Sequence, residues 1–143
     1  MHDLDDVFEQ VSYSPYVAGI CKSLGYQRPI AVQSMYITKQ AEFGGEVRPH
    51  QDGTFLYTNP QSVVGIWWAL ENCHEQNGCL WAVPGSHQQG VKRWFRRKDG
   101  DKGTEFEPKE DDETTTLRTE GAVPLHMEAG DAVLLHHALV HFR

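Results

Sequence analysis

Residues 63–70 read VVGIWWAL, and this nearly continuous apolar run decides the fold class. Its length and its lack of polar alternation are typical of a strand that is buried on both faces. A hairpin turn signal at 77–78 (NG) precedes residues 79–83 (CLWAV), which predict a second strand. Residues 132–135 (AVLL), after the turn signal at 130–131, predict a third strand. Short strands separated by turns favour a mainly β fold, either a barrel or a jelly roll.

The segments that precede this run carry other patterns. Residues 3–25 place apolar side chains at helical spacing in two stretches and predict a pair of supporting helices, interrupted at 14–15 (SP). Residues 30–40 are rich in β-forming residues and predict a strand, and residues 50–57 predict an extended segment. Helices therefore precede the β-rich part of the chain.

The length of 143 residues suits one domain with its own core. We expect residues 1–143 to form a single domain that has helical support at 1–27 and a jelly-roll core at 28–87 and 121–143. Residues 88–120 carry a basic cluster followed by an acidic one and predict an exposed, mobile insertion loop. Such a loop is either a substrate-binding element or solvated surface.

Composition narrows the class of partner. The formal net charge of −7 argues against nucleic acid as a partner. The three cysteines do not form a disulfide framework, which suits a reducing compartment. The sequence contains no apolar run long enough for a membrane span and no signal peptide before its first acidic residues. We therefore expect a cytoplasmic protein that does not bind membranes.

The tripeptide His50-Gln51-Asp52 is the strongest candidate site. On an extended strand, residues two apart point to the same face, so the imidazole and the carboxylate can reach one cation. A second histidine would complete a 2-His-1-carboxylate triad, which favours non-haem Fe(II) chemistry. The best source of that ligand is the cluster of His136, His137 and His141, and the residues alone do not choose among the three. The alternative for the tripeptide is an ordinary surface turn.

Five short motifs follow one another along the chain in a fixed order. They are VQSMY at 32–36, HQD at 50–52, GIW at 65–67, NGCLW at 77–81 and PGSH at 84–87. This ordered set resembles the phytanoyl-CoA dioxygenase family. The resemblance covers nearly the whole chain and is weakest over residues 95–120.

The resemblance implies a fold, an activity and a set of cofactors. The fold is a double-stranded β-helix, which is the jelly roll that the strand pattern favours. The activity is that of an Fe(II)- and 2-oxoglutarate-dependent dioxygenase, which hydroxylates a small or acyl-type organic substrate with O₂ and releases succinate and CO₂. Ascorbate is the reductant that this class implies.

The resemblance also assigns roles to individual residues. It implies three metal ligands, which are His50, Asp52 and His141. It further implies three residues that contact 2-oxoglutarate, which are Met35, Gln51 and Trp67. In this mechanism the protein positions and protects the metal, and no separate acid or base is needed.

Two departures from the family pattern concern the ends of the chain. Family members are longer and carry a Lys and an Arg for 2-oxoglutarate beyond the two ends of this sequence. We therefore expect a chain that is truncated at both ends and lacks the last core strand. Two alternatives stay open: a catalytically silent jelly roll that binds a metal or a partner, and a cupin-type zinc hydrolase or isomerase that uses His50, Asp52 and one distal histidine.

Overall fold

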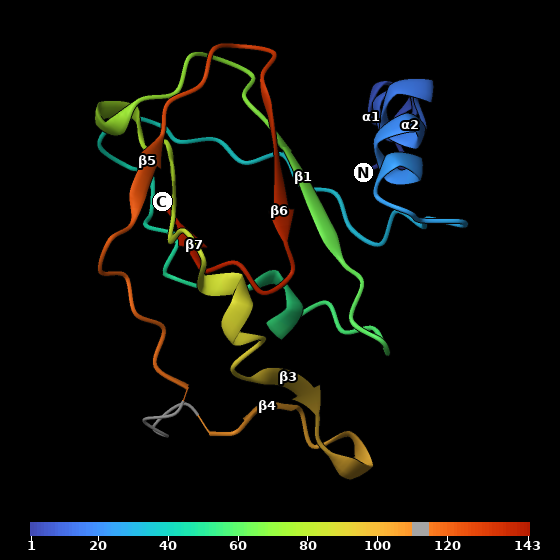
Figure 1. The fold of residues 1–143 in the computed structure, drawn as a ribbon, viewed down its shortest axis with the longest axis vertical. Coiled ribbons are helices and arrows are strands. Elements are labelled where there is room, and N and C mark those ends of the chain that lie inside the picture. Colours follow the sequence, from blue (N-terminus) through green and yellow to red (C-terminus); the bar gives the residue numbers. More distant parts are fainter. Residues whose placement is uncertain (110–114) are drawn as a thin grey trace. The chain divides into compact units, whose positions relative to one another are not determined.

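The computed structural model describes residues 1–109 and 115–143 and has a mainly β fold. The chain forms two compact units, Met1–Thr38 and Lys39–Arg143 (Figure 1). The expectation of a single domain over residues 1–143 stays a prediction. Among the described residues, no helix is long and apolar enough to cross a membrane.

The first unit contains the two predicted helices, α1 (Asp6–Ser12) and α2 (Pro15–Ser23). Each begins at a residue whose side chain accepts hydrogen bonds from free backbone N–H groups of the first turn, Asp5 for α1 and Ser14 for α2. The strand predicted for residues 30–40 is wrong, because this segment has no strand structure. A β-rich composition alone does not make a strand, since a strand needs a partner to pair with.

The second unit contains two sheets whose strands are not neighbours in sequence. In one sheet, β1 (Val64–Trp68) pairs antiparallel with β6 (Ala132–His136), and the two lie side by side in Figure 1. In the other, β2 (Leu80–Ala82) lies between β5 (Val123–Leu125) and β7 (His141–Phe142). Such long-range antiparallel pairing is consistent with the predicted jelly roll.

The strands predicted at 63–70, 79–83 and 132–135 are confirmed as β1, β2 and β6. The hairpin predicted at 77–78 is wrong, because β2 pairs with β5 and β7 instead of the preceding strand. Gly78 instead ends the short 3₁₀ helix η2 (Glu75–Asn77) with a left-handed φ of 77°. The buried apolar side chains of this unit come from these strands and the segments beside them: Ala69, Cys79, Leu80, Ala82, Leu135, Ala138 and Val140.

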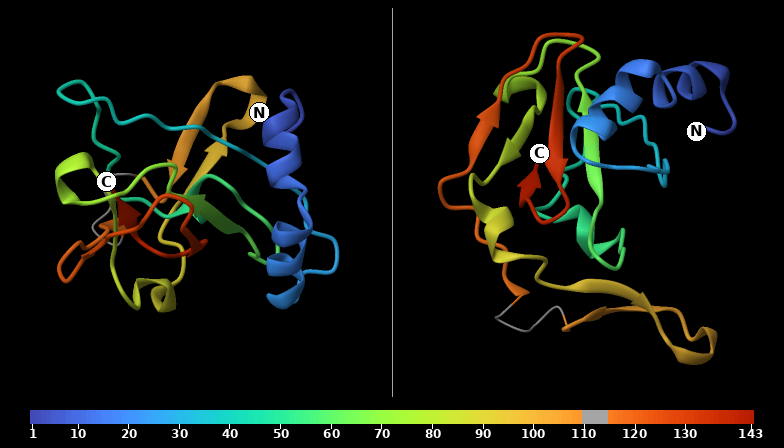
Figure 2. Two further views of the ribbon diagram at one scale, coloured as in Figure 1. Left: turned by 90° about the horizontal axis from the view of Figure 1, so that it is seen from above. Right: turned by 45° about the vertical axis from the view of Figure 1, so that its right-hand side comes forward.

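The charged segment 88–120, predicted as an insertion loop, contains strand structure. It contains an antiparallel hairpin of β3 (Trp94–Arg97) and β4 (Thr104–Glu107), drawn in gold and orange in Figure 2. The short 3₁₀ helix η4 (Asp99–Asp101) lies between these two strands. Another 3₁₀ helix, η3 (Ser86–Gln89), begins within the PGSH motif at 84–87. Residues 110–114, which belong to the predicted loop, lie outside the described residues.

The segment 50–57 is only partly extended. His50 pairs with His141 through the backbone, but Asp52–Thr54 form the 3₁₀ helix η1. Gln51 keeps an extended conformation, with φ −123° and ψ 130°. The chain therefore turns at Asp52, the last residue of the tripeptide that the sequence selects as the candidate site.

Candidate metal centre

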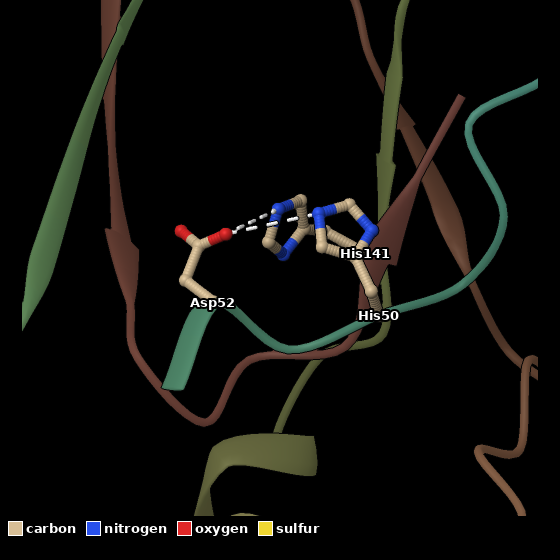
Figure 3. A group of neighbouring side chains, drawn as sticks. All are labelled: His50, Asp52 and His141. Carbon is tan, nitrogen blue, oxygen red and sulfur yellow. Dashed lines mark ion pairs between the residues drawn. The ribbon is translucent and has the colours of Figure 1, made fainter. Parts of the chain in front are cut away.

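Two histidines and one aspartate meet between β7 and η1. His50, Asp52 and His141 each offer one ligand atom, and these three atoms lie within 4.8 Å of one another. Asp52 Oδ1 is 3.7 Å from His50 Nε2 and 3.6 Å from His141 Nε2 (Figure 3). Donor atoms that share one ion at about 2.1 Å lie about 3 Å apart, so a small contraction would suit a metal.

The backbone holds the two imidazoles beside each other. The N–H of His50 donates to the carbonyl of His141, and the N–H of His141 donates to the carbonyl of His50, both at 3.1 Å. Their ring centroids are 4.3 Å apart. Asp52 opens η1, so its carboxylate turns back toward both rings. The pairing of segments far apart in sequence therefore builds this site.

Each imidazole is oriented by a backbone carbonyl behind it. His50 Nδ1 lies 2.9 Å from the carbonyl oxygen of Arg48, and His141 Nδ1 lies 3.0 Å from that of Leu139. A carbonyl oxygen only accepts, so in each ring Nδ1 carries the proton and donates it. The Nε2 lone pairs are left facing Asp52, which is the arrangement in which histidines bind metals.

Burial favours the neutral form of the deepest ligand. The side chain of His141 is 5% exposed, whereas those of His50 and Asp52 are 26% and 23% exposed. Burial lowers the pKa of His141 below its ordinary value, although the Leu139 carbonyl and the Asp52 carboxylate oppose this shift. A neutral imidazole can bind a cation without first releasing a proton.

Two glycines make room for this arrangement. A Cβ at Gly65 would lie 3.1 Å from Asp52 Oδ2 and 3.3 Å from the Cβ of Leu135. A Cβ at Gly53 would lie 2.7 Å from Val91 Cγ2. The Asp52 carboxylate therefore occupies the space beside Gly65. Gly53 of η1 lies so close to Val91 that a larger residue would clash with it.

Gln51 lies between the ligands in sequence, but its side chain is engaged elsewhere. It is 1% exposed. Its Nε2 donates to the carbonyls of Gly90 at 2.9 Å and Ala138 at 2.7 Å, and its Oε1 accepts from the N–H of Lys92 at 2.9 Å. The side chain therefore ties the ligand segment to two other loops.

The other predicted site residues lie in different places. Trp67 is on β1 two residues after Gly65, so it shares the face of the sheet that Gly65 presents to Asp52. Met35 belongs to the first unit and is 64% exposed. Within the described residues, His136 and His137 are outside the cluster, and their ring centroids are 4.1 Å apart.

Sequence reasoning missed Gly65 and Phe55. A lone glycine inside an apolar strand pattern indicates close approach of another group, so Gly65 did carry a signal. Phe55 follows η1, and its ring makes an edge-type contact with the ring of His50, with centroids 6.4 Å apart. No local pattern in the sequence reveals this second contact, because it depends on the turn at Asp52.

Comparisons with known proteins show the family of the chain. The family model described as Phytanoyl-CoA dioxygenase (PhyH) matches residues 1–142. Phytanoyl-CoA dioxygenase 1 of Oryza sativa subsp. japonica is 48% identical over 141 residues, which are 99% of this chain and 48% of that protein. Phytanoyl-CoA dioxygenase domain-containing protein 1 of Mus musculus is 46% identical over 144 residues, again 99% and 48%. The chain spans about half the length of these curated relatives, and it belongs to the phytanoyl-CoA dioxygenase family.

Proposed function

We propose that this chain carries the metal centre of an Fe(II)- and 2-oxoglutarate-dependent dioxygenase, with His50, Asp52 and His141 as ligands. The enzyme would hydroxylate a small or acyl-type organic substrate with O₂. The observation that carries the proposal is the convergence of two carbonyl-anchored imidazoles and one carboxylate on a common point. This donor set, with coordination positions left open, suits Fe(II) oxygenases.

The chemistry comes from the metal and cosubstrate when they are bound: activation of O₂ for C–H hydroxylation, with 2-oxoglutarate leaving as succinate and CO₂. The chain itself contributes position and protection. His141 is held neutral by burial, and the carbonyls of Arg48 and Leu139 fix both rings. Gly65 leaves the space in which the Asp52 carboxylate lies.

The cosubstrate contacts are also part of the proposal. The position of Trp67 on the face of Gly65 supports its assignment to the 2-oxoglutarate pocket. The assignment of Met35 rests on the family resemblance. For Gln51, the three backbone hydrogen bonds favour a positioning role, and contact with the cosubstrate stays a prediction.

The cellular setting follows from the thiols. Cys21, Cys73 and Cys79 are all free, and free thiols persist in a reducing compartment. We therefore place the proposed activity in the cytoplasm.

Metal binding is the first test. We expect anaerobic titration with Fe(II) to show one site, and His50→Ala or Asp52→Ala to weaken it by at least about 100-fold, more than the loss of an outer contact. His126→Ala is the matched control, because His126 is an exposed histidine outside the cluster. Equal affinity in His50→Ala and His126→Ala would refute the assigned ligands.

The second test asks whether the Fe(II)-loaded chain binds and consumes 2-oxoglutarate. Adding 2-oxoglutarate to the Fe(II)-loaded chain under anaerobic conditions should produce a visible charge-transfer band, and admitting O₂ should yield succinate. Metal binding without the band or succinate would favour a catalytically silent metal-binding jelly roll. Zinc recovered with the purified chain, together with O₂-independent turnover, would favour a hydrolase or isomerase.

A further inference from the structure

A cavity lies behind the tripeptide that carries two of the proposed metal ligands. Gln51 has an extended backbone, and neighbouring residues of an extended segment point to opposite faces. Its side chain therefore points away from the carboxylate and imidazole on either side of it, and it lines a cavity of about 570 Å³. This volume lies within the range of about 300–1,000 Å³ that small-molecule sites occupy.

Two cations line this cavity without an ion-pair partner. Lys92 is half-buried and Arg118 is exposed, and neither pairs with a carboxylate among the described residues. By contrast, Arg96 and Lys98 of the same charged segment lie 3.1 and 3.9 Å from glutamates. The formal net charge of the chain is −7, so a general excess of positive charge does not explain the two unpaired cations.

A buried hydroxyl gives the cavity a third donor. Ser86 lines the cavity and is 8% exposed, and its Oγ accepts the N–H of Val140 at 2.9 Å. A hydroxyl also has one hydrogen to donate, and no residue in the described part of the chain accepts it. Buried polar groups are normally paired, so an oxygen of a bound molecule is a fitting acceptor for this hydrogen.

The rest of the lining suits an organic group that carries hydroxyls. Glu120 and Gln89 offer a carboxylate and an amide, which accept hydrogen bonds from hydroxyl groups. Pro84 and Leu117 supply apolar surface beside them. The cavity therefore combines a cationic part with a part that suits a polar organic molecule.

We propose that this cavity, which we call the Lys92 cavity, binds a small hydroxylated organic phosphate. A phosphate monoester carries a charge of about −1.5 to −2 at pH 7, which matches two cations better than a single carboxylate does. The guanidinium of Arg118 has the planar donor fork that suits phosphate oxygens. The Lys92 cavity is separate from the metal centre, so this inference goes beyond the proposed function and does not rest on it.

The experiment is isothermal titration calorimetry of the metal-free chain in EDTA, with glucose 6-phosphate as the probe. Glucose and glucuronate are the comparison ligands, because glucose lacks the anion and glucuronate carries a carboxylate in its place. We expect glucose 6-phosphate to bind at least about tenfold more tightly than glucuronate, and glucose to show no binding, because contacts between charged groups are the strong ones. Equal affinity for glucuronate overturns the choice of phosphate, and equal affinity for inorganic phosphate overturns the organic part of the ligand.

Substitutions locate the bound probe. Lys92→Met and Arg118→Met should each weaken binding at least about fivefold, because each removes a charged contact. The backbone N–H of Lys92, which Gln51 accepts, is kept in this variant, and Lys92→Arg should retain most of the affinity.

Lys102→Met and Arg28→Met are the matched controls, because both cations are exposed and lie outside the cavity. His50→Ala should bind the probe as the parent does. A weaker affinity in His50→Ala would place the phosphate at the metal centre and overturn the inference. Absence of binding to the parent, or equal affinities in the two cavity variants and the two controls, would also overturn it and would leave the metal proposal intact.

Discussion

Replacing Gln51 by Met should destabilise the chain strongly, even though Gln51 is not a proposed metal ligand. Methionine nearly preserves the length and volume of glutamine but removes all three side-chain hydrogen bonds. Each such bond contributes about 1 kcal/mol to the free energy of unfolding. Ala138 is fully buried, so its carbonyl cannot recover a hydrogen bond from water.

These losses add up to about 3 kcal/mol or more, since buried groups left without partners cost about 1–3 kcal/mol each. That is a large fraction of the roughly 5–15 kcal/mol that stabilises a typical domain. The expected fall in melting temperature is roughly 6–12 °C for a chain of this size. Urea unfolding monitored by circular dichroism should show a lower midpoint with the same slope.

Gln88→Met is the matched control, because Gln88 is an exposed glutamine of η3. It should change the stability by less than about 0.5 kcal/mol. A midpoint for Gln51→Met as high as that for Gln88→Met would refute the positioning role of the Gln51 amide. If 2-oxoglutarate affinity then fell in Gln51→Met alone, the side chain would belong to the cosubstrate site.

Three further perturbations test the geometry around the site. Gly65→Ala should weaken Co(II) or Fe(II) binding about 10- to 100-fold, because the added methyl group would press on the Asp52 carboxylate. Gly45→Ala should not weaken it, because a Cβ at Gly45 would have no heavy atom within 4 Å. Equal metal affinities of the two variants would contradict the role of Gly65. Gly53→Ala should lower the free energy of unfolding by about 1–3 kcal/mol, because the added methyl group would clash with Val91. Adding Val91→Ala should restore part of this loss, measured as a higher urea midpoint. No restoration would contradict the clash. Partial burial, followed by the nearby His137 and His87, lowers the pKa of His136 from 6.5, and its Nδ1 accepts the Ala138 N–H. The unfolded chain therefore protonates His136 more readily than the folded chain does, so the free energy of unfolding should fall as the pH drops from above 6.5 through the folded-state pKa. In EDTA, His136→Asn should lose less stability than the parent between about pH 7.5 and about pH 5.5. An equal loss in the two proteins would refute this role of His136.

Local sequence patterns predicted the strands whose apolar side chains are contiguous. The runs at 63–70 and 132–135 became β1 and β6, which pair with each other in register. The run at 30–40 has a similar composition but forms no strand. The hairpin inside 88–120 was missed because its strands are charged on one side, which looks like a solvated loop in sequence.

Local sequence patterns predicted only part of the candidate site. The spacing of His50 and Asp52 gave two members, but the residues alone left three distal histidines. The choice of His141 depends on its reciprocal backbone pairing with His50, which is a long-range property. The orientation of Gln51 away from the cluster likewise depends on the loops that carry Gly90 and Ala138.

The reciprocal pairing of His50 and His141 also sets when the proposed metal site can be completed during protein synthesis. The two histidines are about 90 residues apart, so at about 5–20 residues per second the ribosome adds the second roughly 5–18 s after the first. Throughout that interval the proposed site has only the imidazole of His50 and the carboxylate of Asp52, which together make a weak chelator. The proposed site therefore stays incomplete until β7 has been synthesised and His141 can pair with His50.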